Sequence, residues 1–545
     1  MMKKFYFAAF ALAVSLSAAA QDTYESARLL GSDLNGTARF VGMGGAMDAL
    51  GSDISTITTN PAGIGLFRHS TISASLGFVS QQDAQKFDGL GKTNMSFDQA
   101  GFVYSIRTSE DSYFNFAFNY HKSRNFDQIL SALGSMKNVS SNLITKEKDS
   151  RGFYYLDLDK KGNWVGYESE TSNMMAANYS QLDDLNTNIL DDEVPYQGEI
   201  EKWYFGMAAD AYNFDRSHRG WINDFDFCLS GNEDDRFFWG ITAGIKDVRY
   251  KGYSEYAEGL RMADGTDGGI VTYGDRREIK GTGLDIKFGI IFRPIEESPF
   301  RIGLSAETPT WYTLKTNNTT GLDNRSALGE RIDNNGQIYR TDYGDIENSY
   351  KFKFYTPWRF SLSLGHTVGN YLALGAGIDY SDYGASKNRI DDGEDYDWYY
   401  DEYYERSHTD EVMKRHAENT LKGVATFKLG AELKPVPEVA VRLGYNYVTP
   451  AYETNGVRDQ TLRSPGVSYA STSDFVNWEG THRITAGLGF RLGKMNLDLA
   501  YQYSGTNGTF YPFQPDLKPE RNAYVDGCSV SNKRHQMLVT LGYTF

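Results

Sequence analysis

The feature that most constrains this chain is a repeated alternation of apolar with polar or small residues. In the run 284–292, every second residue is Leu, Ile or Phe, and the intervening residues are Asp, Lys and Gly until Ile291. A strand that crosses a membrane needs about 9–11 residues with an apolar outward face. About fourteen runs fit this pattern: 71–79, 97–107, 112–121, 222–230, 236–248, 279–292, 300–307, 351–366, 371–381, 422–434, 438–447, 482–492, 495–504 and 535–545. They predict an all-β fold, a transmembrane antiparallel β-barrel of about 14 strands.

The connections between these runs support the same fold. Short ones, such as 108–111 and 493–494, alternate with long ones. The long ones are 122–221, 249–278, 308–350, 382–421, 448–481 and 505–534. Outer-membrane barrels have short periplasmic turns and long external loops. We therefore expect residues 70–545 to form the barrel, with about 122–221 as its largest extracellular loop.

The N-terminus has the pattern of an export signal. Lys3 and Lys4 precede a short apolar run, and small residues end at Ala20. The run is too short to span a bilayer as a helix, so we expect residues 1–20 to be a signal peptide cleaved after Ala20. This leader, together with the barrel pattern, predicts the outer membrane of a Gram-negative bacterium, whose lipid and lipopolysaccharide would surround the barrel.

Composition excludes other classes. The mean hydropathy is −0.51, and no later stretch approaches the ~18 apolar residues of a membrane helix. The chain has 38 Tyr and 55 Gly but only 13 Pro, as expected for a β-rich protein with polar loops. Only Cys228 and Cys528 are present, so no disulfide framework holds the fold. The net charge of −16 argues against nucleic acid as a partner.

The last strand carries a signal of its own. Val539, Leu541, Tyr543 and Phe545 alternate with small or polar residues, and the sequence given ends on Phe545. A C-terminal alternating strand ending in Phe resembles the recognition signal of the bacterial barrel-assembly machinery. We therefore expect Tyr543 and Phe545 to serve as the assembly signal and that machinery to be a partner during biogenesis.

Residues 21–69 show no strand alternation and predict a separate element. A short helix fits 23–30, and Gly42, Gly44 and Gly45 follow in a Gly-rich stretch. The lumen of a barrel of about fourteen strands is too wide for side chains alone to fill. We expect residues 21–69 to form a compact hatch inside it.

A turn at Asn60-Pro61-Ala62-Gly63 is expected to anchor this hatch. Proline fixes its own φ and biases Asn60 toward an extended conformation. An Asn side chain can then accept a hydrogen bond from the backbone two residues on. An ordinary Asn-Pro turn with no anchoring role is the alternative.

The hatch segment resembles the start of the FadL/TodX/OmpP1 family of outer-membrane transport proteins, in the form found in Bacteroidetes. The likeness rests on the Gly-rich stretch, Asp53-x-Ser55 and Asn60-Pro61-Ala62-Gly63. It implies a hatch inside a 14-stranded barrel that carries long-chain fatty acids or aromatic hydrocarbons without energy input. The family's side opening is attributed to an irregular third strand, but run 112–121 contains no Gly or Pro from which to predict a kink. The resemblance carries no ligand-binding residue over to this chain.

Other candidate sites are weak. The tract 391–405 is rich in Asp, Glu and Tyr, and Ca²⁺ binding there is weighed against a solvated acidic loop, which we prefer. The eight His residues show no zinc-like spacing, and no catalytic set can be assembled, so we expect neither metal nor cofactor nor enzyme activity.

Two classes of function follow. The first is a channel for passive uptake of hydrophobic small molecules, which the hatch favours. The second is a surface-loop adhesin, a structural barrel or a porin for polar solutes, which the long 122–221 connection favours.

Overall fold

The computed structural model describes most of the chain after the predicted signal peptide. The described residues are 21–141, 156–158, 164–167, 195–196, 199–200, 208–262, 264–326, 330–332, 338–340, 343–397, 402–459, 462, 464, 467, 472–514 and 524–545. The predicted leader, 1–20, lies outside them. None of the described helices is long and apolar enough to cross a membrane.

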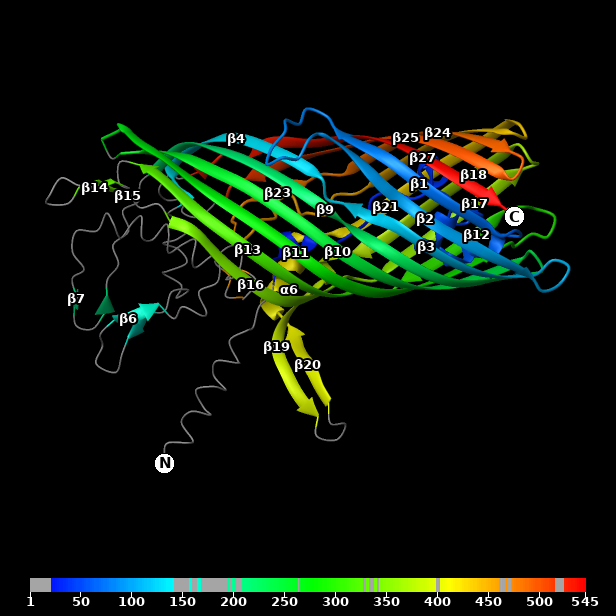
Figure 1. Cartoon of the computed structure of the whole chain (residues 1–545), viewed down its shortest axis with the longest axis horizontal. Coiled ribbons are helices and arrows are strands. Elements are labelled where there is room, and N and C mark those ends of the chain that lie inside the picture. Colours follow the sequence, from blue (N-terminus) through cyan, green and yellow to red (C-terminus); the bar gives the residue numbers. More distant parts are fainter. Residues whose placement is uncertain are drawn as a thin grey trace.

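Fourteen antiparallel strands form a closed barrel, as predicted (Figure 1). In order around the wall they are β1 (Thr71–Gln81), β2 (Thr93–Arg107), β3 (Tyr113–Asn125), β9 (Ala208–Glu233), β10 (Phe237–Arg261), β11 (Asp267–Phe292), β12 (Arg301–Glu307), β17 (Arg359–Val368), β18 (Leu372–Asp382), β21 (Gly423–Val436), β22 (Val439–Val448), β24 (Thr481–Leu492), β25 (Met495–Tyr511) and β27 (Cys528–Thr544). The first and last strands close the wall, with Thr71 opposite Thr544 and Gln81 opposite Arg534. Thirteen of the fourteen predicted runs lie on one of these strands to within a residue or two, and the other, 351–366, overlaps β17.

The polarity of the two faces inverts along the longest strands. On β11, the outward residues from Leu284 to Phe292 are apolar and exposed, while Asp285 and Lys287 are buried inside. Beyond Leu284, the outward positions become Thr, Lys, Glu and Arg, and Ile279 is buried inside. The nine residues 284–292 span about 27 Å at ~3.3 Å per residue, or roughly 20 Å after a tilt of ~40°. That height suits the apolar band of an outer-membrane barrel.

Beyond this band, the wall continues as β-strands that carry polar side chains on the outward face. Where the structure describes them, the long connections predicted as loops therefore contain strand, most fully in 249–278 and 308–350, and the expectation of loops needs correction there. In the largest, 122–221, β3 runs on to Asn125, β4 (Gln128–Val139) follows, and β9 begins at Ala208. The sequence prediction missed these parts because it requires apolar residues on the outward face of a strand. Here the apolar residues face inward, around a second core.

The remaining elements lie mainly outside the apolar band. The strands are β5 (Leu156–Leu158), β6 (Trp164–Tyr167), β7 (Pro195–Tyr196), β8 (Glu199–Ile200), β13 (Trp311–Ser326), β14 (Glu330–Ile332), β15 (Ile338–Arg340), β16 (Tyr343–Tyr355), β19 (Lys387–Asp397), β20 (Glu402–Thr409), β23 (Phe475–Trp478) and β26 (Tyr524–Val525), and the helices are η3 (Tyr383–Ala385) and α6 (Glu411–Thr420). The predicted single run 351–366 is wrong in one respect, because it breaks between β16 and β17 around Pro357, which has no N–H to give the ladder. Most of the acidic tract 391–405 forms the hairpin β19–β20, which projects from the wall (Figure 1).

The hatch lies inside the barrel (Figure 1). It comprises α2 (Thr23–Ala27), α3 (Ala38–Gly42), η1 (Ile54–Thr58) and η2 (Pro61–Leu66). Asp22, Thr37, Asp53 and Asn60 begin these four helices, and the side chain of each accepts a backbone N–H of the first turn. Short polar side chains therefore fold this segment locally, and the barrel wall buries it.

Candidate functional site: the hatch and the cavity beside it

The Asn60 turn forms as its chemistry predicts. Asn60 Oδ1 accepts the N–H of Ala62 at 3.1 Å, and Asn60 Nδ2 donates to the carbonyl of Ile290 on β11 at 3.4 Å. Pro61 occupies the first position of η2, where its missing N–H costs nothing. The side chain of Asn60 thus holds its own turn and contacts the wall at once. Ala62 is fully buried, and the carbonyl of Gly63 accepts the N–H of Ser52 at 3.1 Å.

A ring of glycines on the wall receives the hatch. Eight neighbouring strands, from β10 to β24, each turn one glycine toward it, and a Cβ on any of these would lie within 3.3 Å of a hatch atom. They are Gly240, Gly289, Gly303, Gly365, Gly375, Gly430, Gly444 and Gly487. The backbone of the hatch therefore packs directly on the backbone of the wall, which leaves little free space between them at this level.

The three predicted hatch glycines lie in the stretch of the hatch that packs on this ring. Gly42 lies against Gly487, where an added Cβ would come within 3.2 Å of its Cα. Gly44 has φ +63° and accepts a hydrogen bond from Asn446 Nδ2 at 3.2 Å. Gly45 has φ +77°, a conformation that disfavours other residues. Gly42 and Gly44 thus lie in close contact with the wall, whereas Gly45 packs on Leu34 and Phe40 of the hatch itself.

The wall is irregular between β2 and β3. The pairing of these strands ends at Gln99 and His121, and β3 is irregular between Lys122 and Arg124. The hatch fills the space. Asp33 donates its N–H to the carbonyl of Ser123 at 2.8 Å, and its carboxylate accepts the N–H of Asn125 at 2.8 Å. The irregularity lies just past run 112–121, where no Gly or Pro marks it.

Asn35 completes this bridge across the two strands. Its Nδ2 donates to Asp98 Oδ1 on β2 at 3.0 Å and to the carbonyl of Lys122 on β3 at 2.9 Å. Lys122 Nζ in turn donates to Ser96 Oγ on β2 at 2.6 Å. Side chains rather than a strand ladder therefore hold the two strands together at this point.

A cavity of about 270 Å³ opens beside this bridge. Its apolar lining includes Leu30, Phe126, Val448, Tyr452 and Trp478. The same cavity is lined by four arginines and three carboxylates, one cation in excess: Arg28, Arg124, Arg483, Arg534, Asp33, Asp98 and Glu479. A cavity lining that combines apolar side chains with an excess of guanidinium groups suits an apolar molecule with an anionic end.

The pKa of Asp33 reflects the positive charge of the arginines around the cavity. Burial alone would raise the pKa of its carboxyl group, but Arg124, Arg534 and Arg483 hold that pKa below its ordinary value. One carboxylate thus interacts with three arginines. Sequence reasoning missed these arginines, because nothing in their local pattern shows that they converge.

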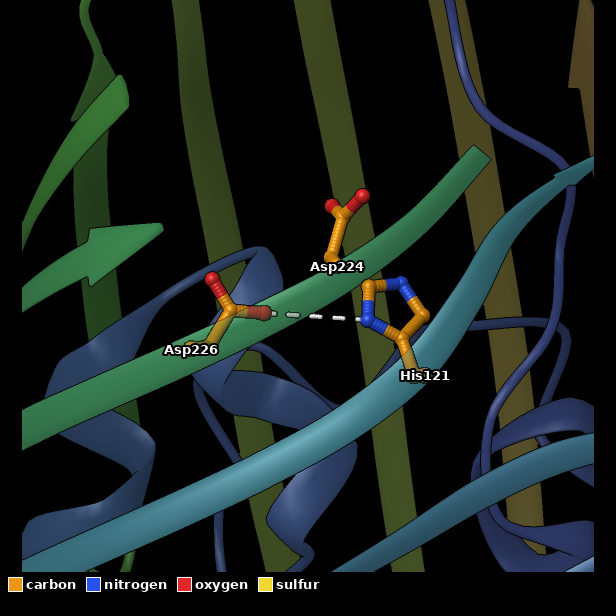
Figure 2. Close-up of side chains that lie close together, drawn as sticks. All are labelled: His121, Asp224 and Asp226. Carbon is orange, nitrogen blue, oxygen red and sulfur yellow. Dashed lines mark ion pairs between the residues drawn. The ribbon is translucent and has the colours of Figure 1, made fainter. Parts of the chain in front are cut away.

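A second group of charged residues lies deeper in the lumen. Figure 2 shows His121 on β3 beside Asp224 and Asp226 on β9. All three are buried, their ligand atoms lie within 4.8 Å of one another, and His121 Nδ1 is 3.7 Å from Asp226 Oδ2. Such a set has the donor types of a divalent-cation site. The dispersed His residues gave no sign of this cluster in the sequence.

Two lysines already compensate these carboxylates. Lys246 Nζ lies 2.6 Å from Asp224, and Lys287 Nζ lies 2.9 Å from Asp226. Both ammonium groups also contact Asp285, at 3.0 and 2.7 Å. A cation placed between Asp224 and Asp226 would be repelled by both lysines. We therefore interpret the cluster as an ion-pair network that braces β9, β10 and β11.

The connection between β22 and β23 holds the start of the hatch through Arg458. Arg458 is almost fully buried and pairs with both Asp22 and Glu25, and Glu25 also pairs with Arg277 of β11. Burial raises the pKa of Asp22 despite Arg458, whereas for Glu25 the effect of Arg277 and Arg458 outweighs burial and lowers the pKa. These ion pairs tie the first helix of the hatch to the outer half of the barrel.

The predicted assembly signal lies on the outside of the last strand. Tyr543 and Phe545 are 38% and 64% exposed, and their rings contact edge to face at 5.1 Å. Phe545 also donates its N–H to the carbonyl of Ser70 at 3.0 Å. Both side chains are accessible to a partner or to lipid.

These features define a class: an outer-membrane type of barrel, closed by an internal hatch, with a mixed apolar and cationic cavity. No protein-family model matches the sequence, and no curated protein sequence matches it. Among solved structures, a FadL homologue of Pseudomonas aeruginosa is similar, with 12% identity, a TM-score of 0.50, and 94% of this chain and 99% of that chain covered.

Two toluene transporters also match, with lower scores. TodX of Pseudomonas putida is 9% identical with a TM-score of 0.45, and TbuX of Ralstonia pickettii is 12% identical with a TM-score of 0.44. Each comparison covers 94% of this chain and 99% of the transporter. The likeness to the FadL homologue confirms, at the level of the fold, the resemblance expected from the hatch.

Proposed function

We propose that this protein is a passive outer-membrane channel for hydrophobic compounds that carry an anionic end, with long-chain fatty acids as the leading substrate class. It acts in transport rather than as an enzyme. The observation that carries this proposal is the cavity beside the hatch, whose lining combines four arginines and three carboxylates with apolar side chains such as Leu30, Phe126 and Trp478. Plain aromatic hydrocarbons have no anionic group, so they could meet those guanidinium groups only through weaker cation–π contacts.

The arginines are placed to bind a carboxylate head. Arg124 Nη1 donates to the carbonyl of Leu30 at 3.1 Å, and Arg483 Nη1 donates to Asn446 Oδ1 at 2.9 Å. Each guanidinium has five N–H donors, so these bonds leave others for a ligand. A carboxylate can be held by two of them in parallel.

The bridge between β2 and β3 supplies a route in this proposal. Asn35 joins the two strands through its side chain, and Asp33 holds the end of β3 through its N–H and its carboxylate. These contacts should open more easily than a strand ladder. Displacing these hatch residues would connect the cavity with the membrane face of the wall. Release toward the periplasm would require the hatch to shift from the glycine ring.

The test is uptake of a radiolabelled long-chain fatty acid beside its methyl ester, by cells with and without the protein. Arg483→Gln and Arg534→Gln should lower uptake of the acid about 10-fold, since a hydrogen bond to a charged group contributes about 1.5–3 kcal/mol. Uptake of the ester should stay unchanged, and Arg325→Gln, at an exposed residue outside the cavity, should alter neither.

Three outcomes would contradict the proposal in different ways. An equal loss for acid and ester would give the arginines a structural role only. Uptake of the acid no faster than in cells lacking the protein would refute the channel. Faster entry of a small sugar would point to a porin.

A further inference from the structure

Basic side chains form a row on the outside of the barrel, beyond the outer edge of the apolar band. The row crosses neighbouring strands that run side by side (Figure 1). Arg249 of β10 lies opposite Lys280 of β11, and Lys280 lies opposite Lys315 of β13. All three are exposed, and the residues before and after them point inward or lie at half-buried turns of the strand. We call these three residues the basic row, which Lys351 of β16 extends by one strand because it lies opposite Lys315.

The basic row lies at the level of lipid headgroups. The apolar band ends in one register on these strands, where Ile245, Leu284 and Trp311 lie opposite one another and are exposed. Tryptophan at such an edge is typical of the membrane interface. The basic row lies four residues further along each strand, about 13 Å at ~3.3 Å per residue, or roughly 10 Å higher after a tilt of ~40°. The long stems of its side chains can carry the charges back toward the band.

The carboxylates near the basic row are too few to neutralise it. Asp247 pairs with Arg249, with 3.4 Å between oxygen and nitrogen. Glu278 pairs with two lysines, Lys280 and Lys251, each at 3.0 Å. Each of these two carboxylates therefore already has a cation beside it.

The position of Lys315 makes the imbalance larger. It lies between Lys280 and Lys351 in the register, and among the residues that the structure describes it has no ion-pair partner. Four cations, the basic row and Lys251, thus face two carboxylates. Like charges directly opposite each other on neighbouring strands destabilise a sheet. An anion bound across the row would remove this repulsion.

Other strands carry different side chains at the outer edge of the band. His482 of β24 and His535 of β27 are the first outward residues past it. Each is hydrogen-bonded to a tyrosine hydroxyl of a neighbouring strand at 2.8 Å, His482 to Tyr445 and His535 to Tyr501. The basic row is therefore a local feature of one side of the wall and not a property of the whole rim.

We propose that the basic row binds the phosphate groups of lipid A, the glycolipid anchor of lipopolysaccharide. Lipid A carries its phosphates on sugars directly above its acyl chains, so a molecule packed on the apolar band presents them to the row. Guanidinium and ammonium groups form charge-assisted hydrogen bonds with phosphate oxygens. The site lies on the outside of the wall, so this inference rests on the outer-membrane location and not on the transport function.

The test is titration of the purified barrel in detergent with lipid A, followed by native mass spectrometry. Lipid A without phosphate groups and phosphatidylglycerol are titrated beside it. Arg249→Gln, Lys280→Gln and Lys315→Gln together should weaken binding of phosphorylated lipid A about 100-fold, since each cation near a membrane surface contributes a factor of about 5. Binding of the form without phosphate should stay unchanged. The heat-modifiable band on a gel should show that this variant folds as well as the wild type, because like charges have been removed.

Two further variants sharpen the test. Glu278→Gln frees two lysines from their carboxylate and should tighten binding of lipid A about 5-fold. Arg107→Gln, Arg236→Gln and Lys494→Gln together remove the same charge from exposed residues at the periplasmic end and should leave binding unchanged.

Four results would overturn the proposal. The first is unchanged binding of lipid A by the variant of the basic row, and the second is an equal loss in the periplasmic control. The third is an equal loss for lipid A with and without phosphate, which would leave only apolar packing. The fourth is equal affinity of the wild type for phosphatidylglycerol, which would mean that the row accepts any anionic lipid.

Discussion

Substitution of one glycine in the ring tests how tightly the hatch is sealed. A Cβ at Gly375 on β18 would lie 1.9 Å from the carbonyl oxygen of Ala46. A carbon and a carbonyl oxygen normally approach to about 3.3 Å, so Gly375→Ala would push this part of the hatch away by about 1.4 Å. Overpacking of this kind typically costs about 1–3 kcal/mol. The barrel should still form, because its strands keep their ladder, but the hatch should fit more loosely.

The same strand supplies the control. Gly377 faces the same side two residues on, and a Cβ there would meet nothing closer than 3.6 Å. In liposomes, Gly375→Ala should admit a small sugar faster than the wild type, and the amides of the hatch should exchange hydrogen faster. Gly377→Ala should match the wild type in both assays. Equal behaviour of the two variants would refute the view that the wall glycines seat the hatch.

Three further predictions concern the hatch and the lumen. Asn60→Ala should loosen the turn and its contact with β11, lowering uptake while barrel levels stay near normal; unchanged uptake and unchanged exchange at Ala62 would leave an ordinary turn. Lys287→Met removes the lysine partner of Asp226 and one of the two lysines that contact Asp285, so it should lower the free energy of unfolding in urea by about 3–5 kcal/mol, and an effect below ~1 kcal/mol would contradict a bracing network. His416 on α6 bonds Thr23 Oγ1 at 2.8 Å and the carbonyl of Val457 at 2.9 Å, and burial lowers its pKa below the ordinary value of 6.5. Its stabilising contribution is therefore present at neutral pH and lost as the pH falls below about 6.5, so proteolysis of the outer loops should accelerate there in the wild type and not in His416→Gln.

Several features could be predicted without the structure because they depend on local chemistry. A strand in a bilayer shows lipid one face and the lumen the other, so its sequence alternates in a way that few other folds require. The Asn60 turn is equally local, since the bond from Ala62 to Asn60 joins residues two apart. Run 222–230, predicted from the same alternation, is part of β9.

Other features could not be predicted, because each depends on residues far apart in the chain. The arginines Arg124, Arg483 and Arg534 come from three strands and meet only when the barrel closes. The irregular pairing past His121 depends on Asp33 of the hatch, which supplies the missing partner. The sequence of a single strand does not show which strands pair with it or what fills the lumen.

The wall glycines illustrate both what the sequence predicts and what only the tertiary structure shows. The sequence by itself determined the strands, their inward and outward faces, the hatch and its turns, because these follow from the period of the chain and from short-range hydrogen bonds. It also showed Gly at inward positions, as in 487 and 489, without a reason for them. Only the tertiary structure decided that eight such glycines form one ring against the hatch, because a ring is a relation among strands at one height in the wall. The same holds for the cavity and for the buried first helix of the hatch, since burial is set by what packs around a residue and not by the residue itself.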